Sequence, residues 1–181
     1  EGARLEVVRA AALLHDWGRA TSETDGRDHA AVAAARAGAY LRQKGVPTVE
    51  VAAISHAIAA HRFRAKPDPE TLEAQTLFDA DKLDAIGAIG IARAFAYGGA
   101  HGQRLWAPRT AVDLEGWDRA GRDQRQRDDP AEHTAVHEFV VKLSRIKDRL
   151  YTAEGRRMAQ DRHQVMVTFF DRLDAEVAGA R

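Results

Sequence analysis

The sequence has no cysteine among its 181 residues and only five prolines. Without cysteine, disulfide bonds, thiolate metal sites and thiol nucleophiles are all excluded. The 27 basic and 27 acidic residues give a net charge of zero, which argues against a broad basic surface for extended nucleic acid but not against a local patch. No apolar run approaches the roughly 20 residues that cross a bilayer, and no signal peptide opens the chain. We therefore expect a cytoplasmic protein with no membrane partner.

Alanine is abundant where aromatic residues are scarce. Ala accounts for 36 residues, whereas aromatic residues make up 7% of the chain. Ala is the strongest helix former, and no segment alternates polar and apolar residues as a strand would. The sequence predicts an all-α fold, a bundle of six or seven helices in a single domain over residues 1–181.

Apolar periodicity and helix-end residues predict the helical segments. They are 3–14, 29–44, 48–61, 70–97 (with a break near Gly87 and Gly90), 131–152 and 154–178. Asp28 and Thr48 are suited to cap the second and third helices. The prediction is thus a core at 1–98, a segment at 99–130 that lacks periodicity and is irregular and mobile, and C-terminal helices at 131–178.

A histidine and an aspartate follow the apolar run ARLEVVRAAALL. His15 and Asp16 are adjacent at the end of the first predicted helix. An imidazole and a carboxylate side by side can both reach one cation, and without cysteine a metal site must use such ligands. The plainer interpretation is a pair of residues that ends the helix and faces water.

A second acidic group lies in LFDADKLD, where Asp79, Asp81 and Asp84 follow one another at spacings of two and three. Residues with these spacings cannot all share one helix face, so Asp79 and Asp81 point in different directions. An inward carboxylate in this apolar segment needs a cation or hydrogen-bond donors. The alternative is an exposed helix with Asp–Lys pairs.

Two motifs taken together resemble those of the HD-domain phosphohydrolase superfamily, LLHDWGR and LFDADKLDAIGAIG. The similarity extends through HAIAAHRFR, between the two motifs, and weakly into KLSRIKDRLYTAEGRRMAQDRHQVM. The resemblance implies an all-helical, metal-dependent enzyme of a small bacterial and archaeal subgroup. It also implies His15, Asp16 and Asp81 as metal ligands. The family pattern has a further His upstream, but none of the eight His precedes His15. We expect either a segment before Glu1 or another ligand to fill that place.

The resemblance further implies that His29 and His61 face the reacting phosphate, where a His can donate a proton or bind an anion. His56 is a third candidate for substrate binding. For each of these histidines, the alternative is a surface or hydrogen-bonded side chain without a role in the reaction.

Cationic and aromatic residues between and beside these motifs are candidates for binding substrate. Guanidinium groups match phosphate oxygens, so we expect Arg62 to bind phosphate, with Arg19, Lys82 and Arg93 extending the anionic pocket. Tyr97, beside the pocket in the family resemblance, is a candidate for stacking on a base. Solvated side chains are the alternative in a chain with 22 Arg.

The predicted function is hydrolysis of a nucleotide or another small phosphate ester, with release of phosphate or pyrophosphate by metal-activated water. The ligands favour Mn, Fe or Ni, with Mg and Zn as alternatives. Asp16 would orient or deprotonate the water. Two other functions stay open: a di-iron oxygenase that uses two of the additional His, and a degenerate domain that binds nucleotide without turnover. A homo-oligomer is compatible with the sequence.

Overall fold

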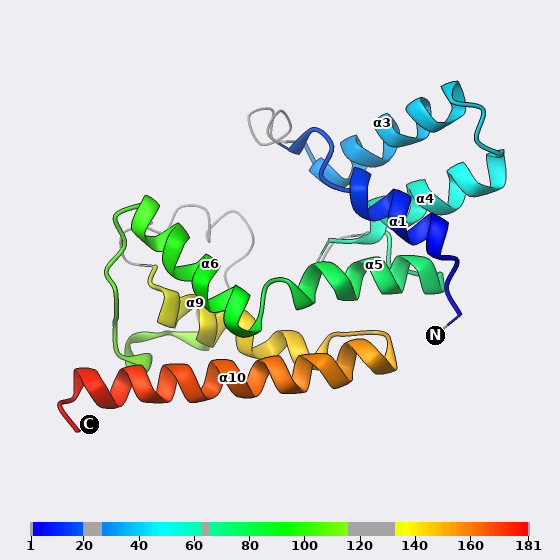
Figure 1. Cartoon of the computed structure of the whole chain (residues 1–181). Helices are drawn as coiled ribbons and strands as arrows, with labels where there is room; N and C mark the ends of the chain where they lie inside the picture. Colours follow the sequence, from blue (N-terminus) through cyan, green and yellow to red (C-terminus); the bar gives the residue numbers. More distant parts are fainter. Residues whose placement is uncertain (1, 20–26, 63–65, 116–132, 181) are drawn as a thin grey trace. The chain divides into compact units, whose positions relative to one another are not determined.

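The computed structural model describes residues 2–19, 27–62, 66–115 and 133–180. Over these residues it contains seven α-helices, two short 3-10 helices and no strand (Figure 1), which confirms the predicted all-α fold. No helix in the described ranges is both long and apolar enough to cross a membrane. The chain divides into two compact units, Glu1–Asp81 with Leu150–Gly155, and Lys82–Arg149 with Arg156–Arg181. The single domain over residues 1–181 stays a prediction.

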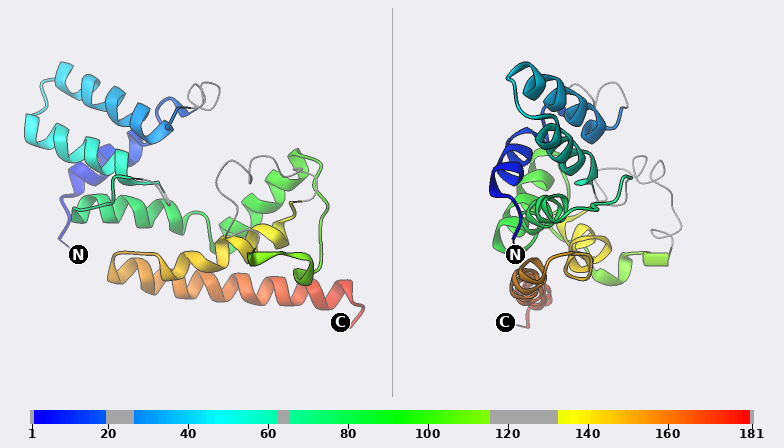
Figure 2. Two further views of the ribbon diagram at one scale, coloured as in Figure 1. Left: turned by 180° about the vertical axis from the view of Figure 1, so that it is seen from behind. Right: turned by 90° about the vertical axis from the view of Figure 1, so that its right-hand side faces the viewer.

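The first unit contains helices α1 (Leu5–Leu14), α3 (His29–Gln43), α4 (Thr48–Ala60) and most of α5 (Leu72–Leu83). Helices α3 and α4 lie side by side in every view, and α1 packs on α4 (Figures 1 and 2). The contact between α3 and α4 is close, because a Cβ added at Gly38 would lie 2.9 Å from Ser55 Oγ. Small side chains permit this approach, and half of the buried apolar residues of the unit are Ala, eight of 16.

The predicted capping residue is confirmed for α3 and is wrong for α4. The side chain of Asp28 accepts a hydrogen bond from the backbone N–H of Ala30, 2.9 Å long, and so caps α3. Thr48 is instead the first residue of α4, and Pro47 before it offers no side-chain acceptor. Helix α3 ends before Gly45, whose φ of +75° favours glycine.

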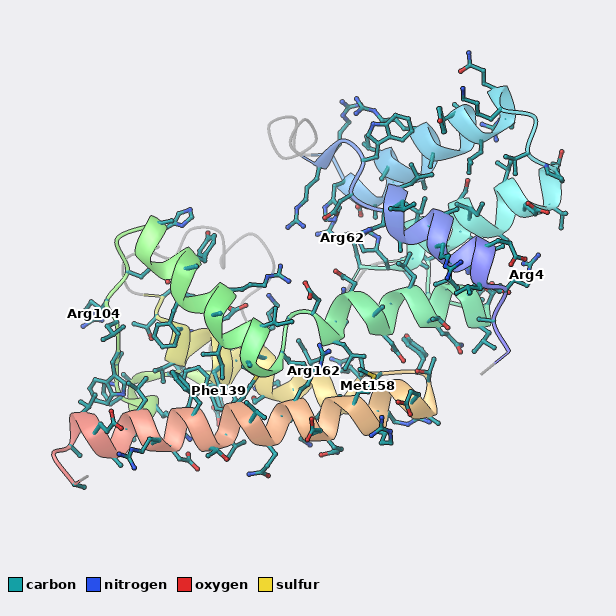
Figure 3. The ribbon with its side chains drawn as sticks, in the orientation of Figure 1. Arg4, Arg62, Arg104, Phe139, Met158 and Arg162 are labelled. Carbon is teal, nitrogen blue, oxygen red and sulfur yellow. The ribbon has the colours of Figure 1, made fainter. Side chains whose placement is uncertain are left out.

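The second unit contains α6 (Gly87–Ala100), α9 (Ala135–Val141), most of α10 (Ala153–Val177) and the 3-10 helices Arg109–Ala111 and Leu143–Asp148. Its core is built from large side chains. The ring of Phe139 on α9 (labelled in Figure 3) stacks on that of Phe170 on α10, with 4.4 Å between centroids.

The predicted break near Gly87 and Gly90 separates α5 from α6. Gly87 has a φ of +74°, and a Cβ there would lie 2.9 Å from Cγ of Arg162, which donates a hydrogen bond to the carbonyl of Leu83. A Cβ at Gly90 would lie 2.2 Å from the carbonyl oxygen of Ala85. Both glycines are therefore required by close backbone and side-chain contacts in this turn.

The predicted helix at 131–152 is wrong in its length. Helix α9 begins after Thr134, whose side chain caps it. It ends at Val141, because the backbone of Lys142, with a φ of −135° and a ψ of −58°, leaves the helical path. Residues 131 and 132 lie outside the described residues.

Most of residues 101–115 are irregular, as predicted, but they are fastened to α10. Trp106 Nε1 donates to Asp174 Oδ1 over 2.7 Å, and Arg109 pairs with Asp171 over 2.8 Å. This part of the segment is therefore held in place. The prediction for residues 116–130 falls outside the described residues.

Candidate metal centre

Three potential ligand atoms meet in the first unit, from His15, Asp16 and His61. They all lie within 4.8 Å of one another, and they are the one such group found among the described residues. The rings of His15 and His61 meet edge to face, with 5.1 Å between centroids. The ends of α1 and α4 therefore bring together two imidazoles and a carboxylate.

The two histidines have the same local setting. His15 directly follows α1, and His61 directly follows α4. In each ring, Nδ1 lies beside the backbone carbonyl three residues earlier, at 2.7 Å from that of Ala12 and 2.6 Å from that of Ile58. A carbonyl only accepts, so Nδ1 carries the proton in each ring and Nε2 keeps its lone pair in the neutral form. The negative ends of two helix dipoles also favour a cation here. Histidines that bind a metal through one nitrogen usually donate the N–H of the other to a carbonyl or carboxylate in this way.

Asp16 supplies the strongest indication of a cation site. Its Oδ2 accepts a hydrogen bond from Arg19 over 3.1 Å and lies 3.6 Å from His15 Nε2. Its Oδ1 is buried and has no hydrogen-bond partner among the residues that the structure describes. An unpartnered buried carboxylate oxygen is costly unless a cation or a water binds it. The residues present therefore fit a divalent metal ion.

His29 lies against the same group. Its Nε2 is 3.9 Å from Asp16 Oδ1, and its ring centroid is 5.5 Å from that of His61. Burial lowers the pKa of His29, and the positive charges of Arg62 and Arg19 lower it further. His29 is consequently a neutral imidazole near pH 7, able to accept a proton or to bind a metal ion.

Arg62, which we expected to bind phosphate, pairs with Asp28. Its Nη1 lies 3.1 Å from Asp28 Oδ1, and Figure 3 labels Arg62 near the start of α3. Burial raises the pKa of Asp28, but the hydrogen bonds from Ala30 and Arg62 outweigh burial, so the pKa is lowered. Asp28 is thus ionised at neutral pH and holds one edge of the guanidinium.

Of the two aspartates near the end of α5, it is Asp79 that is fully buried, at 2% exposure. Its carboxylate accepts hydrogen bonds from the backbone N–H groups of Tyr151 and Thr152 and from the Thr152 hydroxyl, at 2.7–2.9 Å. Asp79 is therefore satisfied by donors and needs no cation. Asp81 is half-buried and is not part of the three-residue group.

The other predicted substrate-binding residues are placed as follows. His56 Nε2 accepts a hydrogen bond from the backbone N–H of Glu70 over 3.2 Å. Lys82, in the second unit, is buried. Arg93 and Tyr97 are four residues apart on α6 and so share one face of it. Arg93 donates to Asp84 over 2.5 Å, and the Tyr97 ring stacks on His101 and is 57% exposed.

Known proteins are similar to this chain over most of its length. A family model described as the HD domain matches residues 1–86. The uncharacterized protein YpgQ of Bacillus subtilis (strain 168) is 30% identical over 183 residues, which covers 99% of this chain and 76% of YpgQ. An HD-superfamily hydrolase from Bacillus thuringiensis has a similar crystal structure, with a TM-score of 0.69 and 28% identity over 98% of this chain and 76% of that one. YpgQ in complex with ADP aligns with a TM-score of 0.58 and 24% identity over 94% and 84% of the two chains.

The chain belongs to the HD-domain family and has the fold of the HD-superfamily hydrolases. Of the residues predicted for the site, the structure brings together His15, Asp16, Arg19, His29 and His61, all in the first unit. His61 was expected to face the phosphate, and its place beside His15 and Asp16 was not predicted. The available signal was its position at the end of an apolar helix, which it shares with His15.

Proposed function

We propose that this protein is a metal-dependent phosphohydrolase that releases phosphate or pyrophosphate from a nucleotide. The observation that carries the proposal is the meeting of His15, Asp16 and His61 at one point, where no described residue donates a hydrogen bond to Asp16 Oδ1. Similarity to an HD-superfamily hydrolase supports hydrolysis. The crystallisation of the relative YpgQ with ADP supports a nucleotide as the ligand.

A divalent cation would be held by His15, Asp16 and His61, with Asp81 as the further ligand that the family resemblance implies. Two imidazoles with carboxylate oxygens suit Mn, Fe or Ni, and Mg and Zn are alternatives. A cation bound there would polarise a phosphoryl oxygen and lower the pKa of a bound water.

The chain's own side chains would do the remaining work. Asp16 orients or deprotonates the attacking water, because no donor in the described part of the chain bonds its Oδ1. The lowered pKa of His29 favours a role as a second base over the predicted role as a proton donor to the phosphate. Arg19 and Arg62 neutralise charge that develops on the phosphate. Lys82, Arg93, Tyr97 and His56 stay predicted contacts of the nucleotide.

The proposal is tested by following phosphate and pyrophosphate release from nucleoside di- and triphosphates in the presence of Mn²⁺. We expect EDTA to abolish release and Mn²⁺ to restore it. Asp16→Asn should reduce kcat/KM by on the order of 10³-fold or more, because it removes a charged ligand with little change of shape. The control is Asp68→Asn, which breaks an exposed ion pair with Lys66 in the same unit and should leave the rate unchanged. Turnover that persists in EDTA contradicts the proposal.

A second function is favoured by the position of His29. Its Nε2 lies 3.9 Å from the Asp16 oxygen that has no hydrogen-bond partner in the described ranges, and its ring centroid lies 5.5 Å from that of His61. Additional histidines beside the carboxylate fit a two-iron centre that oxidises a substrate with O₂. Two iron atoms per chain with a matching optical spectrum, and no phosphate release, would favour this function. Nucleotide binding without any turnover would instead favour a degenerate binding domain.

A further inference from the structure

Two pairs of adjacent residues fasten the start of α3 to the end of α4. Asp28 and His29 begin α3, whereas His61 and Arg62 follow α4. The outer members form an ion pair, with 3.1 Å between Arg62 Nη1 and Asp28 Oδ1. The inner members are in ring contact, with 5.5 Å between the centroids of His29 and His61. The ion pair therefore lies directly beside His29 and beside His61, which is part of the candidate metal centre.

One oxygen of Asp28 serves both helices. Asp28 Oδ1 accepts the hydrogen bond from the backbone N–H of Ala30 that caps α3, and the same atom receives Arg62. Capping fixes the first turn of α3, on which His29 stands. Because the cap holds the carboxylate in one orientation, the carboxylate in turn holds the guanidinium in one place.

An arginine held in this way loses little further freedom when it binds an anion. The guanidinium has five N–H donors in a fixed plane, and the contact with Asp28 uses the Nη1 edge. Within the described part of the chain the other donors have no partner, so they can reach a phosphate oxygen. A carboxylate that fixes an arginine beforehand lowers the ordering cost of substrate binding.

We propose that Asp28 is a positioning residue of the site, which holds Arg62 beside His29 and His61 so that Arg62 contacts the phosphate groups of a nucleotide. This inference rests on the proposed function. It assigns a role to a residue that touches neither the metal ligands nor the reacting atoms, and it makes the ion pair part of substrate binding.

The substitution Asp28→Asn separates the two roles of the carboxylate. Asn caps helices as well as Asp does, so the cap of α3 is retained while the charge that holds Arg62 is lost. We expect KM for the nucleotide to rise about tenfold, which corresponds to one weakened charge-assisted contact, while kcat changes much less. The melting temperature should stay close to that of the wild type. Asp28→Ala loses the cap as well, so it should show the same raised KM as Asp28→Asn and a lower melting temperature than Asp28→Asn.

A double-mutant cycle tests whether Asp28 acts through Arg62. Arg62→Ala alone should raise KM at least as much as Asp28→Asn, and the combined variant should show no further rise. The control is Glu73→Gln, which breaks the 2.9 Å ion pair with Arg4 in the same unit and should leave KM unchanged.

The outcomes separate this inference from the proposed function. If the wild type is active, two results overturn the role of Asp28 and leave the proposed function in place. One is an unchanged KM for Asp28→Asn. The other is that the effects of Asp28→Asn and Arg62→Ala on KM are independent and multiply in the combined variant. Titration of wild-type protein with ADP in the presence of Mn²⁺ provides the second measurement. A wild type that neither binds ADP nor releases phosphate overturns both the proposed function and this inference.

Discussion

The two units of the chain bury different kinds of side chain. Eight of the 16 buried apolar residues of the first unit are Ala, against two of 12 in the second unit. In the first unit the small residues let α3 and α4 approach closely, as the contact of Gly38 with Ser55 shows. In the second unit the space between α9 and α10 is filled by rings such as Phe139 and Phe170. The first unit thus gains from close backbone contact, and the second from large apolar surface.

Two buried or partly buried carboxylates, Glu138 in the second unit and Asp16 in the first, also differ in their hydrogen bonding. In the second unit, Glu138 accepts a hydrogen bond from Lys142 over 2.7 Å and lies 3.0 Å from His133 Nε2. In the first unit, Asp16 has one buried oxygen to which no described residue donates a hydrogen bond. An unsatisfied group costs stability, and such costs are typical of sites that bind a ligand. The candidate site therefore lies in the unit with small side chains. In the other unit the carboxylate of Glu138 has hydrogen-bond partners, and this cluster stabilises the fold.

The largest effect on stability is expected from the aromatic core of the second unit. Phe170 is fully buried, so Phe170→Ala should lower the free energy of unfolding by about 3–5 kcal/mol, measured by urea denaturation. The neighbouring Phe169 is 38% exposed and serves as the control, because Phe169→Ala should cost much less. Equal losses for the two variants would mean that the stacking of Phe170 on Phe139 does not dominate this core.

How far the sequence predicts the fold is clear from two helix boundaries. The break before α6 was predictable, because glycines at 87 and 90 are a local signal for a turn. The early end of α9 was not, because Lys142 is an ordinary helix residue and its backbone angles have no local sequence signal. Local signals therefore placed most helices, whereas a break without such a signal was missed.

The same division holds for the candidate site. His15 and Asp16 are adjacent in sequence and follow an apolar helix, so the pattern itself indicated a site. The pairing of Arg62 with Asp28, and the burial of Asp79 against Thr152, join residues far apart in the chain. Such pairings depend on how the helices pack, which residue spacing along one helix does not specify.

A smaller effect that depends on pH is expected from Glu138. Burial raises the pKa of Glu138, but the hydrogen bond from His133 and the charge and hydrogen bond of Lys142 outweigh it and lower the pKa to about 2, from an ordinary value of 4.5. A lowered folded-state pKa stabilises the protein above the unfolded-state pKa, and this stabilisation is lost as the pH falls toward 2. Its size at pH 7 is on the order of 3 kcal/mol, with about half left at pH 3.

The test of this effect is urea denaturation of the wild type and Glu138→Gln at several pH values. The wild type should be the more stable protein at pH 7, and the difference should shrink between pH 4.5 and 2. A difference that stays constant over this range would show that the charge of Glu138 does not contribute to stability.

The smallest effect is expected from overfilling the alanine core of the first unit. Ala37 on α3 is fully buried in the core cluster of the first unit, so Ala37→Val adds two methyl groups to a packed core. Such overpacking costs about 1–3 kcal/mol. Val is also a weaker helix former than Ala, and Ala35→Val, at an exposed position of the same helix, measures that contribution by itself. The difference between the two variants in urea denaturation then gives the cost of packing alone. A difference near zero would mean that α3 and α4 separate easily, and that the close contact of small side chains does not hold the first unit together.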